Sequence, residues 1–245
     1  ILTGLFDHMV MKRNARGVSD QAITGETAAA GRLSVRIRAG GRVTERGLGR
    51  VAPGTFAVRL KGLPTGGPYQ LELRVTDRAR QTLDALPVRD VLVGDVWVLA
   101  GQSNMEGCGQ LKYALKPHPR IRNFYMSDTW AVAKDPLHGS WSAVDAVHHD
   151  LGVGYTAPVD PVIGSGLALA FGRRMLALTG VPQGFIACAH GGTSMTTWDP
   201  ALKEQGGKSL YGAMVRRVQK NGGRVAGVLW HQGCSETAVE NQPVY

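Results

Sequence analysis

Residues 1–90 contain short segments in which apolar and polar residues alternate at every second position. RLSVRIRA, GTFAVRLKGL and YQLELRVTD follow this pattern, and the turn-forming stretches AGG, PTGG and DRAR lie beside them. Such alternation is typical of strands with one face against a core. We therefore expect a small all-β sandwich over residues 1–90.

After residue 90 the pattern changes to strands that alternate with helices. Two segments place apolar residues at helical spacing, and three compact apolar runs predict buried strands. The expected helices are 165–178 and 208–220, and the expected strands are 91–100, 184–189 and 225–230. This order predicts a parallel sheet with right-handed crossovers in a second domain, residues 91–245. Residues 108–160 show no period and are expected to be loops.

Composition and charge narrow the class of protein. Hydrophobic residues make up 43% of the 245 residues, which is normal for a globular core. No apolar run reaches about 18 residues, so we expect no membrane span. The net charge is +9, but the arginines are scattered along strand-like segments. This scatter favours solvated strand faces over attraction to acidic polymers, and without a reading motif we expect no nucleic-acid partner.

The three cysteines, Cys108, Cys188 and Cys234, show no metal-site or disulfide-framework spacing. We expect no metal site. Buried small side chains are favoured over one bridged pair.

A glycine-containing loop follows each of the three predicted strands. The loops are GQSNM, HGGTSMTTW and HQGCSE. Because the carboxyl ends of parallel strands meet at one edge of a sheet, these loops are expected to converge. A serine nucleophile needs a turn that exposes it and donors that stabilise an oxyanion. Gly101 can supply the turn for Ser103. The Ser103 amide, an amide of Gly191 or Gly192, and the Gln232 side chain can supply the donors.

Each of these assignments has a structural alternative. Ser103 could simply cap a helix. Trp198 could stack on a sugar ring or cover the core, and Asn104 could orient Ser103 or bind substrate. His190 and His231 are interpreted as loop histidines rather than as bases. Asp95 and Glu106 are interpreted as local structural anchors.

The block GDVWVLAGQSNMEG resembles the nucleophile block of the sialate O-acetylesterase-like branch of the SGNH hydrolases. LFDHMVMKRN and LPTGGPYQLELRV resemble the N-terminal β-domain of that family, and AHGGTSMTTW and GVLWHQG resemble its second and third loops. The resemblance extends over essentially the whole chain. It implies a flavodoxin-like three-layer α/β/α domain and a serine esterase that deacetylates carbohydrates without a metal or cofactor.

By position in these blocks, Ser103 becomes the nucleophile, and the Ser103 amide, Gly191 or Gly192, and Gln232 become the oxyanion donors. The resemblance implies an acetylated carbohydrate as substrate, sialic acid or another glycan, and a periplasmic or extracellular location. It does not indicate an oligomeric state.

Two departures from the family pattern stand out. Cys234 occupies the position of a usual Glu, and Glu236 follows two residues later. No AspxxHis block follows Gln232. We therefore expect the chain to be part of a longer enzyme, with the catalytic His and Asp beyond Tyr245. The alternatives are a catalytically silent carbohydrate-binding scaffold and an acetyltransferase that uses the same serine.

Overall fold

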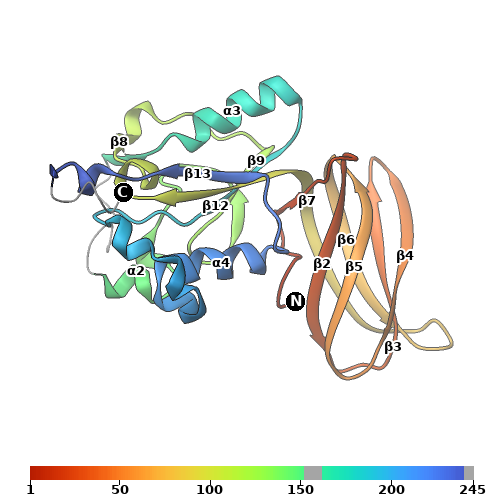
Figure 1. Cartoon of the computed structure of the whole chain (residues 1–245). Helices are drawn as coiled ribbons and strands as arrows, with labels where there is room; N and C mark the ends of the chain where they lie inside the picture. The colour runs from red at the N-terminus through yellow and green to blue at the C-terminus, as the bar shows by residue number, and fades with distance from the viewer. Residues whose placement is uncertain (152–161, 240–245) are drawn as a thin grey trace.

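The computed structural model describes residues 1–151 and 162–239 and has one large mixed sheet at its centre (Figure 1). In these residues nine strands join in the sheet, in the order β10-β9-β12-β7-β6-β3-β4, with β1 and β13 also paired to β7. The strands of this sheet are β1 (Val10–Lys12), β3 (Gly31–Ala39), β4 (Arg42–Val51), β6 (Gly66–Thr76), β7 (Thr82–Gly101), β9 (Ile121–Phe124), β10 (Trp130–Val132), β12 (Gln183–Ala187) and β13 (Gly227–His231).

The N-terminal part is β-rich, as the alternation predicts. The strands β2 (Val18–Thr27) and β5 (Gly54–Pro64) form an antiparallel pair. Its buried residues Ile23 and Leu60 belong to the same core as Leu33, Val35 and Leu73 on the large sheet. The segments predicted as strands are confirmed as β3, β5 and β6. The alternation analysis did not identify β2 and β4.

Strand β7 joins the two parts of the molecule (Figure 1). Its first half pairs with β6, and its second half pairs with β12 and β13 in parallel. The sequence predicts this strand to begin at Val91, but it begins at Thr82. The proposed domain boundary at residue 90 therefore falls inside a continuous strand, and the division into two domains stays a prediction.

The large sheet is only partly parallel. β9, β12, β7 and β13 run parallel to one another, whereas β10 is antiparallel to β9, and β6 is antiparallel to β7. The expected parallel sheet is thus one portion of a mixed sheet. Residues 1–90, expected to form a sandwich, share β7 with this mixed sheet, because that strand continues through residue 90 without a break.

Helices cover both sides of the parallel portion. In Figure 1, α3 (Ala168–Thr179) lies on one side, and α4 (Leu210–Lys220) and α2 (Val147–Asp150) lie on the other. Gly180, in the left-handed conformation, ends α3, and the Ser209 side chain caps α4 by accepting from the Gly212 amide. Both helices confirm the expected segments. No helix among the described residues is long and apolar enough to cross a membrane.

Residues 108–151 are less irregular than the sequence predicts. They contain β9, which adds to the parallel portion beside β12, and several short elements. The short elements around the sheet edge are α1 (Ser103–Glu106), β8 (Gly109–Gln110), η1 (Leu111–Tyr113), η2 (Ser140–Ser142), β11 (Ile163–Ser165), η3 (Met195–Trp198), η4 (Pro200–Lys208) and η5 (Cys234–Glu236). The remainder of the predicted loop, 152–160, lies outside the described residues.

Candidate active site

Ser103 lies immediately after the end of β7, at the carboxyl edge of the parallel strands. Gly101 ends this strand with φ +126°, and a Cβ there would lie 2.1 Å from the His231 carbonyl oxygen, so a larger residue does not fit. The Gln102 amide donates to the same carbonyl at 2.9 Å. Ser103 then opens α1 with a half-buried side chain. The turn therefore places the serine beside the loop that follows β13.

Gln102 connects the serine turn to that third loop. Its buried side-chain oxygen Oε1 accepts hydrogen bonds from the amides of Gly233, Cys234 and Ser235, at 3.3, 3.0 and 3.4 Å. One side chain thus holds three successive amides in place. We did not identify this role from the sequence, because no local spacing signal distinguishes such a contact across 131 residues.

Glu106, at the end of α1, connects the serine turn to the second loop. Its buried carboxylate oxygen Oε2 accepts a hydrogen bond from the Gly191 amide at 2.8 Å. The interpretation of Glu106 as a structural anchor is confirmed. This bond also distinguishes the two candidate glycines, because the Gly191 amide already points at a carboxylate. Gly192 is exposed and has φ +72°.

The second and third loops are also bonded directly to each other. The Gln232 side chain donates through Nε2 to the Thr193 carbonyl at 2.8 Å, and Ser235 Oγ donates to the same oxygen at 3.0 Å. Glu236 Oε1 accepts from the Met195 amide at 2.8 Å. Glu236 therefore supplies a carboxylate contact between these loops, although Cys234 occupies the usual Glu position.

The two expected substrate-binding residues differ in exposure. Asn104 is exposed, and its Nδ2 lies 3.5 Å from Cys234 Sγ, so it borders the third loop. Trp198 is only 3% exposed, packs edge-on against Trp230 and donates to Thr193 Oγ1 at 3.3 Å. Of the two alternatives for Trp198, covering the core is the arrangement that the structure describes.

Three histidines are buried below the loops. His148 and His190 stack, with a 2.8 Å contact between their Nδ1 atoms, and His138 Nδ1 contacts the Glu106 carbonyl oxygen at 3.0 Å. Burial lowers the pKa of His138 to about 4. Burial, reinforced by His190, lowers the pKa of His148 to about 2. Both imidazoles are therefore neutral at pH 7. In the described part of the chain, no residue accepts a hydrogen bond from Ser103 Oγ.

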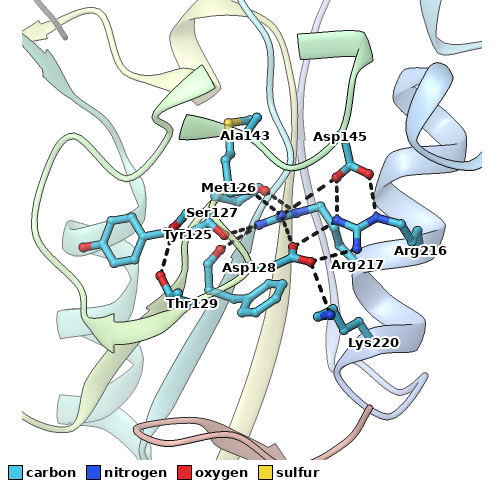
Figure 2. A network of polar contacts seen from close by, with 12 residues as sticks. Tyr125, Met126, Ser127, Asp128, Thr129, Ala143, Asp145, Arg216, Arg217 and Lys220 are labelled. Carbon is cyan, nitrogen blue, oxygen red and sulfur yellow. Dashed lines mark hydrogen bonds and ion pairs between the residues drawn. The ribbon is translucent and has the colours of Figure 1, made fainter. Parts of the chain in front are cut away.

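A buried arginine of α4 supports the strand that leads into the second loop. Arg217 is 0% exposed and donates through Nε to the carbonyl oxygen of Ala187, the last residue of β12, at 3.0 Å. Figure 2 shows its guanidinium beside Asp128, which also forms ion pairs with Arg216 and Lys220. Burial would raise the pKa of Asp128, but these cations reverse the effect and lower it.

All three cysteines are free thiols. Cys188 is buried among apolar residues, and burial raises its pKa to about 11. Cys108 and Cys234 are exposed, so the expectation of buried cysteines is wrong for these two. Both lie in loops near the carboxyl edge, where the sheet does not cover them.

Comparison with known proteins identifies similar chains. Residues 93–245 match the family model described as carbohydrate esterase, sialic acid-specific acetylesterase. A probable carbohydrate esterase from Arabidopsis thaliana is 29% identical over 159 residues, which cover 58% of this chain and 54% of that protein. Human sialate O-acetylesterase is 28% identical over 210 residues, which cover 73% of this chain and 38% of that protein.

A solved structure of similar fold is the carbohydrate acetylesterase from Xanthomonas citri. Its TM-score is 0.59 at 22% identity, and the match covers 97% of this chain and 52% of that one. The chain thus spans about half the length, or less, of these relatives.

Proposed function

The chain belongs to the family of sialic acid-specific carbohydrate acetylesterases, and we propose from this that it is a serine esterase acting on an O-acetylated carbohydrate. The finer fold assignment, a flavodoxin-like three-layer domain of the SGNH type, is part of the same proposal. Helices on both faces of parallel strands support it (Figure 1).

We assign the nucleophile to Ser103. Its Oγ attacks the acetyl carbonyl, the bond from this carbon to the sugar oxygen breaks, and the sugar oxygen takes up a proton. Water then attacks the acetyl-enzyme, acetate leaves, and Ser103 Oγ regains its proton. The proton carrier is proposed to be a histidine that an aspartate orients, as in other serine hydrolases.

Three donors are assigned to the oxyanion: the Ser103 amide, the Gly192 amide and the Gln232 side chain. Gly192 is chosen over Gly191 because the single amide hydrogen of Gly191 is donated to Glu106. Gln232 Nε2 carries a second hydrogen besides the one that it donates to the Thr193 carbonyl. The substrate-facing role of Asn104 is retained, since this side chain is exposed beside Ser103. Trp198 is given no sugar-stacking role because of its burial.

One observation supports the proposal most strongly. Hydrogen bonds that Gln102 and Glu106 accept from backbone amides connect the Ser103 turn to both of the other loops. Residues that are about 85 and 130 positions away are thereby bonded to the short segment that carries Ser103.

The test uses the complete protein and an acetate ester of a sugar. Ser103→Ala is expected to abolish hydrolysis and leave the circular dichroism spectrum and melting temperature unchanged, because the side chain makes no hydrogen bond to a described residue. Thr44→Ala, which removes an exposed hydroxyl from β4, is the control and should retain full turnover. Normal turnover by Ser103→Ala would refute the assignment.

A silent scaffold is the second candidate, because no described base contacts Ser103 Oγ. Treatment with a serine-directed organophosphonate separates the two functions. An enzyme gains the mass of the reagent at Ser103, whereas a silent scaffold does not. Product analysis with an added sugar acceptor distinguishes hydrolysis from acetyl transfer.

A further inference from the structure

Positive charge is concentrated on the β-rich part of the molecule. Residues 31–89 contain twelve Lys and Arg against four Asp and Glu, which accounts for nearly all of the net charge of +9. The period of two along β3 directs this charge outward. Arg32, Arg36 and Arg38 are exposed on one face of the strand, while the alternate residues are buried apolar side chains.

A hollow of about 900 Å³ lies at the end of this face. It is bordered by the start of β3, the end of β4 and the turn between β6 and β7, so it lies at the end of β7 opposite to Ser103. Its cationic lining residues are Arg32, Arg50, Arg78 and Arg80, and much of the remaining lining is glycine. We name this site the arginine hollow.

The four arginines are exposed, and none of them forms an ion pair within residues 1–151 and 162–239. Arg32 and Arg50 are direct partners in the β3–β4 register. Like charges directly opposite each other in a sheet are destabilising. The one acidic residue of the lining, Asp77, uses Oδ1 to accept the Gln81 amide within the turn.

Glycines shape the floor on which these side chains lie. The guanidinium of Arg32 lies across Gly47, with Nη2 3.0 Å from the place of a Cβ at that position. A Cβ at Gly31 would come within 2.4 Å of the Thr76 carbonyl oxygen. Glycine at position 47 therefore leaves room for the Arg32 guanidinium, and glycine at position 31 allows β3 to approach β6 closely.

We propose that the arginine hollow binds the carboxylate groups of an acidic polysaccharide. The planar fork of an arginine matches a carboxylate with two parallel hydrogen bonds, and several such forks suit a polymer with repeated carboxylates. Binding of anions would also relieve the repulsion between Arg32 and Arg50. The choice of a polysaccharide rests on the proposed function, since an esterase that acts on a glycan needs to hold that glycan.

The rest of the sheet face supports an extended ligand. A second hollow, of about 260 Å³, is lined by Arg36, Arg38 and Arg89 on the same face. Arg32 and Arg38 are separated by about 20 Å along β3 at the usual rise of a strand. Glu45 and Glu72 flank Arg36 in the register, so the least compensated charge is at the arginine hollow.

Nucleic acid is the less favoured polyanion. Unpaired bases are bound by stacking on aromatic side chains, and no aromatic residue lines the arginine hollow.

The test measures retardation of the complete protein in native gels that contain polygalacturonate, with dextran as the neutral control. The Ser103→Ala background is used, so that binding is separated from turnover. The double variant Arg32→Gln/Arg50→Gln is expected to weaken binding about tenfold or more, because it removes two charge-assisted contacts. Arg174→Gln/Lys208→Gln removes two exposed cations from α3 and η4 and should change binding less than about twofold.

A second variant guards against local unfolding of the strand pair. Arg78→Gln changes only the turn and is expected to weaken binding severalfold, with an unchanged melting temperature. Equal binding by the Arg32/Arg50 and Arg174/Lys208 variants would overturn the proposal, as would retardation by dextran as strong as by polygalacturonate. Tighter binding of a DNA duplex of equal charge would favour nucleic acid instead. The esterase assignment is tested separately, by turnover of the Ser103 variant.

Discussion

The two glycines of the second loop differ in what their amide hydrogens contact. The Gly191 amide donates to Glu106 at 2.8 Å, whereas Gly192 is exposed with a positive φ. A carboxylate that accepts from Gly191 fixes the peptide group between His190 and Gly191, which directly precedes the group that carries the Gly192 amide. At the scale of single residues, Glu106 is therefore proposed to position Gly192 rather than to contact substrate.

The Gln232 side chain supplies a prediction at this scale. Replacing it with Ala is expected to lower kcat about 10²–10³-fold and to leave KM nearly unchanged, because an oxyanion donor acts in the transition state. Steady-state kinetics on the acetate ester measure both constants. Gln219→Ala, an exposed change on α4, is the control. A rise in KM with constant kcat would assign Gln232 to substrate binding instead.

Some residue roles could be read from the sequence and others could not. Gly101, Ser103 and Gln232 follow strands, so their approximate placement at one edge could be predicted from the order of elements. The bonds of Gln102 and Glu106 join residues 85 or more positions apart, and no local pattern encodes such partners. The edge-on contact of Trp198 with Trp230 of β13 joins residues 32 positions apart, and periodicity does not predict it either.

Helix α4 attaches to the sheet through polar groups as well as through its apolar face. Arg217 donates to the carbonyl oxygens of Phe124, Tyr125, Met126 and Ala187, and its guanidinium lies 4.7 Å from the Phe124 ring centroid. Figure 2 shows these contacts with the turn after β9. One side chain thus ties two parallel strands to a helix.

Arg217→Met is expected to lower the free energy of unfolding by roughly 3–5 kcal/mol, since it strips a buried ion pair and leaves several carbonyl groups without a donor. Urea denaturation followed by circular dichroism measures the change. Arg174, an exposed residue of α3, is the control, and Arg174→Met should change the free energy of unfolding by less than about 0.5 kcal/mol. Equal losses for the two variants would mean that Arg217 contributes no more than a surface charge.

The hydrophobic pattern predicts elements correctly where the periodic segment is long, and it misses elements where polar residues interrupt the segment. The helices α3 and α4 have several turns and clear stop signals, so the sequence predicts both. β9 has four residues and includes Arg122, which is buried because it pairs with Asp90 at 2.8 Å. The sequence does not predict the first part of β7, residues 82–90, because most of its side chains are exposed and form no apolar run.

The buried histidines predict that the free energy of unfolding of the whole molecule falls at acidic pH. His138 and His148 have folded-state pKa values below the unfolded value of about 6.5, so the unfolded chain binds more protons as the pH falls. Stability is therefore lost below about pH 6.5. At pH 5 each histidine costs roughly 2 kcal/mol relative to pH 7.

Asp135 acts in the opposite direction. Burial raises its pKa to about 6, so its ionisation destabilises the fold as the pH rises, and acidification restores about 1 kcal/mol between pH 7 and pH 5. The net result is a lower urea midpoint at pH 5 than at pH 7. Asp135→Asn should enlarge this difference, and identical midpoints at the two pH values would contradict the assignment of neutral buried histidines.

Strand β7 contributes its backbone hydrogen bonds to both parts of the molecule. A cut between Arg89 and Asp90 would divide β7 within its pairing with β6. It would also separate β12 and β13, which pair with the second half of β7, from the first half of that strand. Neither fragment would contain the complete sheet. The two parts are for this reason expected to unfold together in a single cooperative transition.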